Sequence, residues 1–361
     1  MLCKRCAEKV VLEIDKSAGI CPLCAGIFEK IDEVAIMIAK KLNFDFDSFQ
    51  IGIRGEGSFR ALQEFFEIRG VDYDLKTEIK NELQSRLKEI TGKRISSDPD
   101  ALIVFNPEDL SFEITIKPFY IYGRYIKRIR NISQTRWLCG KCKGIGCEIC
   151  NQTGKRYLHS VEELISNPAI ELFQAKNAIL HGSGREDVDA RMLGSGRPFV
   201  LEIVEPKKRK IDLSELERKI NEFCVGKVAV KNLGYANAKD VEKVKEGGFR
   251  KVYRAKVVFD REVSREELEK VLNELIGEIR QKTPERVMHR RADKLRVRRL
   301  YKAEIVAHFG KIAVLKFEAE AGLYIKELVS GDSGRTEPNL SKNFKAFVEK
   351  LDVLEVLDSE K

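Results

Sequence analysis

The sequence predicts an α+β protein of two or three domains with packed cores. Its 361 residues exceed the roughly 150 residues of an average domain. Apolar residues make up 43% of the chain and charged residues 34%, which argues against wholesale disorder and favours cores beneath a charged surface. Runs rich in β-branched and aromatic residues alternate with helix-capping patterns, which is typical of helices packed beside a sheet.

The first third of the chain is expected to form a small α+β unit. Helical periodicity predicts a helix around Asp32–Leu42 and an amphipathic helix over Leu75–Ile90, which Gly92 ends. The apolar run Ala101–Phe105 predicts a strand. Phe112–Ile126, rich in Ile, Phe, Tyr and Thr, predicts a strand that pairs with it.

The rest of the chain alternates helix starts with β-rich runs. Three capping-box patterns predict helix N-termini: Ser160 with Glu163, Asp212 with Glu215, and Ser264 with Glu267. Five β-rich runs predict strands: Phe199–Val204, Lys227–Val230, Tyr253–Phe259, Lys302–His308 and Ile312–Glu318. The apolar periodicity of Phe344–Leu357 fits either a helix or a strand.

The chain shows no sign of a membrane or secretory destination. No apolar run reaches the roughly 18 residues of a membrane span. The first ten residues lack the apolar core of a signal peptide. We therefore expect a cytoplasmic protein without a membrane partner.

Eight of the nine cysteines form four Cys-x-x-Cys pairs, and without a secretory signal this pattern favours metal binding over disulfides. The first set, with a spacing that resembles a zinc ribbon, is Cys3, Cys6, Cys21 and Cys24. The second set is Cys139, Cys142, Cys147 and Cys150. Because four ligands within twelve residues are cramped, pairs from the two sets could instead share a metal. We expect one or two structural zinc ions, because four thiolates leave no open position for a reacting water. The ninth cysteine, Cys224, is expected to be a core residue.

Basic residues are clustered, although a net charge of +9 could serve solubility alone. Between Arg286 and Lys302 there are eight Lys or Arg residues and a single acidic one, Asp293. A second cluster covers Lys207–Lys210, and a third, over Arg124–Arg130, is preceded by and interleaved with tyrosines. Cations mixed with aromatic rings suit RNA, whose bases stack on rings while its phosphates meet the charges.

The segment from His181 to Pro198 is dense in Gly, carboxylate and Arg, and it predicts an ordered functional loop. A carboxylate beside arginine stays ionised at neutral pH, because the opposite charge lowers its pKa, and it can then act as a nucleophile. The alternative is a Gly-rich turn that holds structural ion pairs. The glycines match neither a P-loop nor a dinucleotide fingerprint.

Three parts of the chain resemble the Pus-ten family of tRNA pseudouridine synthases, archaeal type. The similar stretches are Phe119–Tyr125 with Gln134–Trp137, Gly184–Gly194 with Gly196–Phe199, and Gly322–Val329 with Gly331–Pro338. The resemblance implies that Asp187 is the catalytic Asp, with Asp189 as its rival. It implies that Lys326 pairs with that Asp and that Tyr253, Tyr324 and Arg185 contact the substrate. Strand packing is the alternative role for the two tyrosines.

The resemblance also implies a fold. The catalytic part would be a pseudouridine-synthase domain, with a mixed, largely antiparallel sheet and flanking helices. The N-terminal part would be a zinc-bearing, THUMP-like RNA-binding module. The expected divisions are a zinc-ribbon-like head (1–30), the THUMP-like module (31–138), the second cysteine cluster and linker (139–155), and the catalytic domain (156–361).

The implied substrate is tRNA, modified in the T-arm loop at positions 54 and 55, with no small-molecule cosubstrate. The implied isomerisation requires no organic cofactor, which agrees with the missing nucleotide fingerprint. A monomer is the expected oligomeric state. Attack by Asp187 at uracil C6 and attack at ribose C1′ are both compatible with the sequence. Two other functions stay open: a different THUMP-type tRNA-modifying enzyme, and a zinc-dependent RNA-binding protein without catalysis. The first would need a cofactor-binding loop and the second would not need Asp187.

Overall fold

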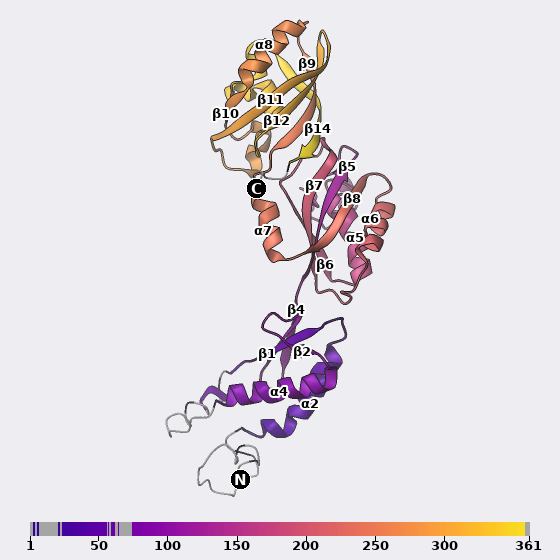
Figure 1. The fold of residues 1–361 in the computed structure, drawn as a ribbon, viewed down its shortest axis with the longest axis vertical. Helices are drawn as coiled ribbons and strands as arrows, with labels where there is room; N and C mark the ends of the chain where they lie inside the picture. Colours follow the sequence, from indigo (N-terminus) through magenta and orange to yellow (C-terminus); the bar gives the residue numbers. More distant parts are fainter. Residues whose placement is uncertain are drawn as a thin grey trace. The chain divides into compact units, whose positions relative to one another are not determined.

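The structure is a computed structural model that describes residues 3, 6, 21, 24–55, 57, 59–61, 64 and 74–357. Most of the expected head over residues 1–30 lies outside these residues. The chain divides into two compact units (Figure 1). The first unit comprises Met1–Phe119, Phe173–Lys176 and Val204–Lys210, and the second comprises the remainder. The finer domain boundaries expected from the sequence stay predictions.

In its described residues, the first unit is a four-stranded sheet packed against two helices. Its elements are α2 (Ile27–Lys41), β1 (Ser48–Ile53), α4 (Leu75–Thr91), β2 (Arg94–Ile95), β3 (Ala101–Phe105) and β4 (Phe112–Ile116). The strand order is β2-β1-β3-β4. The Asp74 side chain accepts a hydrogen bond from Thr77 N to start α4, and Gly92, with φ 67°, ends it. Both expected helices and the strand at Ala101 are confirmed.

The expected strand Phe112–Ile126 is wrong as a single element. It breaks at Pro118, which has no N–H to donate to a sheet. The part before the proline, β4, pairs antiparallel with β3 as expected. The part after it, β5 (Phe119–Lys127), belongs to a different sheet.

The second unit is built on a ten-stranded sheet. Its order is β13-β10-β11-β12-β9-β14-β7-β5-β8, with β6 paired to β7. The strands other than β5 are β6 (Asn177–Gly182), β7 (Arg191–Val204), β8 (Val228–Ala236), β9 (Lys251–Phe259), β10 (Gly277–Gln281), β11 (Arg296–Phe309), β12 (Ile312–Ala319), β13 (Thr336–Glu337) and β14 (Ala346–Val356). Neighbours from β13 to β14 are antiparallel, and so are β5 and β8, whereas β14 and β7 are parallel. The expected α+β class and mixed, largely antiparallel sheet are confirmed, and Phe344–Leu357 proves to hold a strand.

The helices that flank this sheet are α5 (Val161–Phe173), α6 (Leu213–Phe223), α7 (Ala238–Glu246), α8 (Arg265–Leu275) and α9 (Ile325–Ser330). Of these, α5, α6 and α8 begin where the three capping patterns predict. The side chains of Ser160, Asp212 and Ser264 each accept a hydrogen bond from a backbone N–H in the first turn of the helix that follows. Short 3-10 helices complete the unit: η1 (Glu148–Cys150), η2 (Glu285–Arg290), η3 (Asp332–Gly334) and η4 (Leu340–Lys342).

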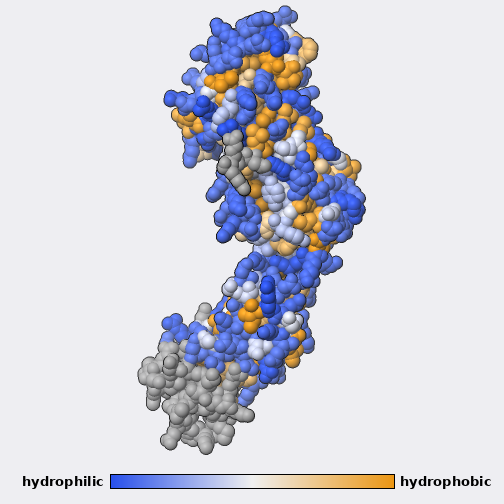
Figure 2. Space-filling model, in the orientation of Figure 1, coloured by the Kyte–Doolittle hydropathy of each residue, from blue (hydrophilic) through white to orange (hydrophobic). Residues whose placement is uncertain are grey.

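The surface is as polar as the composition suggests. Hydrophilic residues cover most of the face that Figure 2 shows for both units. Among the residues that the structure describes, no helix combines the length and the apolar character that crossing a membrane requires. Cys224 is fully buried, so its expected place in the core is confirmed.

Candidate active site and cysteine clusters

The loop over residues 183–190, between β6 and β7, carries Asp187 at the edge of a pocket of about 260 Å³. The five non-cysteine site residues singled out from the sequence all line this pocket: Arg185, Asp187, Tyr253, Tyr324 and Lys326. They come from three parts of the chain that the sheet brings together: the β6–β7 loop, strand β9 and the start of α9. The placement is consistent with their expected roles, which stay predictions.

Two cations hold the carboxylate of Asp187. Arg286 Nη1 donates to Oδ1 over 2.9 Å, and Lys326 Nζ lies 3.5 Å from Oδ2. Burial by itself would raise the pKa of Asp187, but the two positive charges outweigh it and the pKa is lowered. Asp187 is therefore ionised at neutral pH while 27% of its side chain stays exposed.

Lys326 contacts the rival carboxylate more closely. Its Nζ lies 2.8 Å and 2.7 Å from the two oxygens of Asp189, compared with 3.5 Å from Asp187. The side chain of Asp189 is 55% exposed, twice the fraction of Asp187, and Asp189 is not among the residues that line the pocket. Lys326 thus bridges both carboxylates.

Arg286 is a site residue whose contact with Asp187 the sequence did not indicate. It lies on η2, and besides Asp187 it meets Glu327, whose Oε1 accepts from Nε over 2.6 Å. Glu327 is almost fully buried, so it orients the guanidinium toward Asp187. Arg286 begins the basic run that suggested phosphate binding. Two features of the sequence could have indicated this role. Arg286 lies in the basic run Arg286–Lys302, and Glu327 lies in the family-like stretch Gly322–Val329.

The two tyrosines of the pocket are held differently. Tyr324 exchanges two backbone hydrogen bonds of 2.9 Å with the side chain of Gln281, and its hydroxyl accepts from Arg291 Nη1 over 2.7 Å. Tyr253 projects from β9, is 8% exposed, and has its pKa raised to about 12 by burial. Both rings are thus fixed in the pocket wall, and Tyr253 keeps its proton at neutral pH.

Two further basic residues line the pocket. Lys251, two residues before Tyr253, is buried, and its Nζ donates to Phe249 O over 3.0 Å. Burial and the nearby Arg197 lower its pKa to about 8. Arg185 is exposed, and within the described part of the chain no hydrogen bond or ion pair holds it, which leaves its guanidinium available to a substrate.

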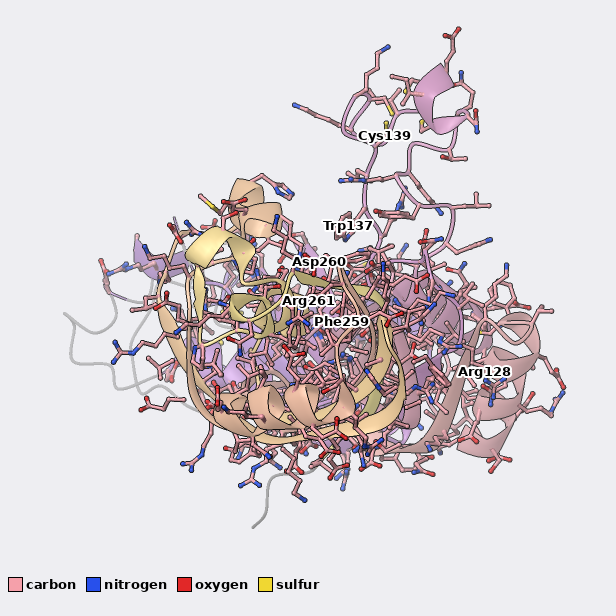
Figure 3. The ribbon with its side chains drawn as sticks, turned by 90° about the horizontal axis from the view of Figure 1, so that it is seen from above. Arg128, Trp137, Cys139, Phe259, Asp260 and Arg261 are labelled. Carbon is pink, nitrogen blue, oxygen red and sulfur yellow. The ribbon has the colours of Figure 1, made fainter. Side chains whose placement is uncertain are left out.

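The eight paired cysteines form two separate clusters. In each set of four, the sulfur atoms all lie within 4.8 Å of one another. The first cluster is Cys3, Cys6, Cys21 and Cys24, and the second is Cys139, Cys142, Cys147 and Cys150. Sharing of a metal between the two sets, the alternative left by the sequence, is therefore wrong. Figure 3 shows Cys139 and Trp137 on a loop that projects from the sheet of the second unit.

Both clusters fit a zinc ion. Zinc–sulfur bonds of about 2.3 Å in a tetrahedron place sulfur atoms about 3.8 Å apart. The distance from Cys3 Sγ to Cys24 Sγ is 3.7 Å, and in the second cluster three such distances are 3.9, 3.8 and 3.6 Å. Backbone N–H groups of Cys147 and Gly154 outweigh burial and lower the pKa of Cys150 to about 6, which favours the thiolate that a metal needs.

Comparisons of the amino-acid sequence find relatives along nearly the whole of this chain. The family model described as "Pus10, C-terminal" matches residues 120–357. The tRNA pseudouridine synthase Pus10 of Archaeoglobus fulgidus is 52% identical over 362 residues, which cover 98% of this chain and 99% of that protein. The protein of the same name from Methanopyrus kandleri is 42% identical, over 94% of this chain and 80% of its own length.

A solved structure, "Crystal Structure of a Cbf5-Nop10-Gar1 Complex", aligns with 53% of this chain and 44% of its own, at 17% identity and a TM-score of 0.35. We draw nothing from so low a score. The family model and the relatives at up to 52% identity carry the assignment. The chain belongs to the Pus10 family.

Proposed function

We propose that this chain is a tRNA pseudouridine synthase that isomerises uridines 54 and 55 of the T-arm loop, with Asp187 as its nucleophile. The observation that carries the proposal is the ionised Asp187, held by Arg286 and Lys326 at the edge of a pocket walled by Tyr253 and Tyr324. Relatives over the full length of the chain bear the name tRNA pseudouridine synthase.

The reaction needs one nucleophile and no imported group. Asp187 attacks either C1′ of the ribose or C6 of the uracil. The bond from N1 to C1′ breaks, the base turns, C5 bonds to C1′, and the bond to Asp187 breaks again, which regenerates the carboxylate. C5 then loses its proton while N1 gains one, so the product is an isomer of the substrate. No electron is exchanged, in keeping with the expectation that no organic cofactor takes part.

The pocket requires the target base to leave its stack. A uridine in a folded loop reaches a carboxylate at a pocket edge only when it is flipped out. Tyr253 and Tyr324 offer aromatic surface to such a base, and Arg185 offers a free cation. Zinc, when bound by the two cysteine clusters, supplies structure only, because each set of four thiolates closes the coordination sphere.

The test uses an unmodified tRNA transcript and the full-length protein without added cofactor. Pseudouridine is mapped by carbodiimide labelling and reverse transcription, for wild type, Asp187→Asn and Asp189→Asn. We expect stops at positions 54 and 55 with wild type, none with Asp187→Asn, and a reduced but measurable yield with Asp189→Asn, because Lys326 retains Asp187 as a partner. A yield that survives Asp187→Asn but not Asp189→Asn would transfer the nucleophile to Asp189. Tight tRNA binding without product would instead favour an RNA-binding protein without catalysis.

A further inference from the structure

Beneath the loop that carries Asp187 lies a cluster of buried polar side chains, which we call the buried polar cluster. Its members are Tyr125, Lys127, Gln134, Glu186 and Arg197. Lys127 and Tyr125 are 0% exposed and Arg197 is 1% exposed, and the other two are buried as well. None of the five has a reacting role in the chemistry proposed above, although such burial of charged groups is unfavourable unless it is compensated.

Donor side chains of the buried polar cluster form hydrogen bonds with main-chain carbonyl oxygens of the loop over residues 183–190. Arg197 Nη1 donates to Ser183 O over 2.6 Å, and Gln134 Nε2 donates to Gly184 O over 2.9 Å. Lys127 Nζ donates to the carbonyl oxygen of Asp187 itself over 3.1 Å and to that of Val188 over 3.3 Å. Side chains therefore reach four carbonyl oxygens of the stretch 183–188, and those of Asp187 and Val188 also accept from the backbone N–H groups of Ala190 and Asn131.

Glu186 ties these donors together from within the loop. Its Oε2 accepts from Arg197 Nε and from the Tyr125 hydroxyl, each over 2.8 Å, and its Oε1 lies 3.6 Å from Lys127 Nζ. The Tyr125 hydroxyl in turn accepts from Gln134 Nε2 over 2.8 Å. The residue directly before the nucleophile is thus the acceptor that fixes the orientation of the donors.

Packing alone does not explain why the buried polar cluster contains charged side chains. Replacing a buried ion pair by apolar residues of similar volume is often neutral or stabilising, so stability alone does not explain one lysine, one arginine and one glutamate at this depth. The loop has no regular secondary structure, however, so side-chain donors that bind its carbonyl oxygens restrict a backbone that strand or helix hydrogen bonds do not fix. At Asp187 the ammonium of Lys127 is a second donor to the carbonyl oxygen, beside the backbone N–H of Ala190, and the backbone of this residue sets the direction of its carboxylate.

We propose that Lys127, with Gln134 and Arg197, forms a set of positioning residues that hold the backbone of Asp187 and so aim its carboxylate into the pocket. The inference rests on the proposed role of Asp187 as nucleophile. Lys127 acts through the carbonyl of Asp187 and touches no reacting atom. Its loss therefore lowers the rate of the chemical step without weakening the affinity for tRNA, since a misplacement of about 1 Å can reduce a rate about 100-fold.

The experiment compares four variants of the full-length chain with wild type: Lys127→Met, Glu186→Gln, the double variant of both, and Gln134→Leu. The control is Lys256→Met, a lysine on β9 whose ion pair with Glu349 lies outside the pocket and the cluster. Each protein is measured for its melting temperature, its dissociation constant for tRNA, its single-turnover rate, and hydrogen exchange of a peptide that covers residues 183–190.

For Lys127→Met we expect a rate about 100-fold lower, an unchanged dissociation constant, and faster exchange in the loop peptide. The double variant is the decisive one, because the cluster then has the same net charge as in wild type. We expect its melting temperature to exceed that of Glu186→Gln while its rate stays as low as that of Lys127→Met. A rate that recovers together with the melting temperature would overturn the proposal, because the charges would then serve stability only.

Gln134→Leu covers the case in which the lysine variant does not fold, since it removes one loop donor without changing any charge. A slower rate with unchanged tRNA affinity supports the proposal, and a wild-type rate with wild-type exchange in the loop overturns it. Failure of the proposed function gives a different result: wild type itself then forms no pseudouridine, while hydrogen exchange still reports whether the cluster orders the loop.

Discussion

Arg286 donates a hydrogen bond to the Asp187 carboxylate over 2.9 Å, although 99 positions separate the two residues in the sequence. The guanidinium is held from its other side by the buried Glu327. Arg286 is therefore a fixed cation beside the proposed nucleophile, and it lies closer to it than Lys326 does.

We expect Arg286→Gln to lower the single-turnover rate more than Lys326→Met does. Arg286 makes the shorter contact with Asp187, and its loss also leaves the buried Glu327 without its hydrogen-bonded partner. Because one charge-assisted hydrogen bond is worth about 1.5–3 kcal/mol, a loss of roughly 10- to 100-fold is expected. The measurement is pseudouridine formation under enzyme excess. Equal single-turnover rates for Arg286→Gln and Lys326→Met would show that Arg286 contributes no more to the reaction than Lys326 does.

The pH dependence of the same variant is a second expectation. The cations keep the pKa of Asp187 below its ordinary value, so the carboxylate is ionised throughout the neutral range in wild type. Removing Arg286 takes away the larger of the two lowering charges, and burial then raises the pKa. The acidic limb of the rate–pH profile of Arg286→Gln should accordingly move to higher pH. An acidic limb at the same pH as in wild type would contradict this assignment of the charges.

Lys251 should make stability depend on pH in the alkaline range. Burial lowers the pKa of Lys251 in the folded protein to about 8 from its ordinary value of 10.5, so the unfolded chain holds this proton more tightly. The folded state is disfavoured by this group below pH 8, and stability recovers as pH rises from about 8 toward 10.5. We expect Lys251→Met to be more stable than wild type at pH 7, by up to about 3 kcal/mol. Denaturant unfolding at pH 7 and pH 10 measures it, and the advantage should shrink at the higher pH.

The cysteine geometry predicts two zinc ions per chain. Mass spectrometry of the metal content should find two in wild type and one in the double variant Cys139→Ser/Cys142→Ser, because the second cluster then keeps only two thiolates. Cys224→Ala is the matched control, since this buried cysteine belongs to neither cluster. A zinc content that is the same in the double variant as in wild type would show that the second cluster is not a zinc site.

The elements that could be predicted from the sequence are those set by local physical chemistry. Helix α4 begins at the side chain of Asp74 and ends at the left-handed Gly92, and both signals lie within one turn of the helix they bound. The strand Ala101–Phe105 is equally local. The one wrong strand shows the limit of such signals, because Phe112–Ile126 has a continuous β-rich composition and only Pro118 divides it between two sheets.

The candidate site divides in the same way. The sequence alone determined the family-like loop with Asp187 and the four Cys-x-x-Cys pairs, because a motif is a property of neighbouring residues. Only the tertiary structure decided that Arg286 donates a hydrogen bond to Asp187. It also decided that Lys326 lies closer to Asp189 than to Asp187. The hydrogen bond from Lys127 to the carbonyl oxygen of Asp187 is likewise a tertiary contact. The physical reason is that ion pairs and buried hydrogen bonds depend on which strands become neighbours. The strand order β9-β14-β7-β5 places β14 beside β7, which lies more than a hundred residues earlier in the chain. No local periodicity of the sequence indicates this pairing.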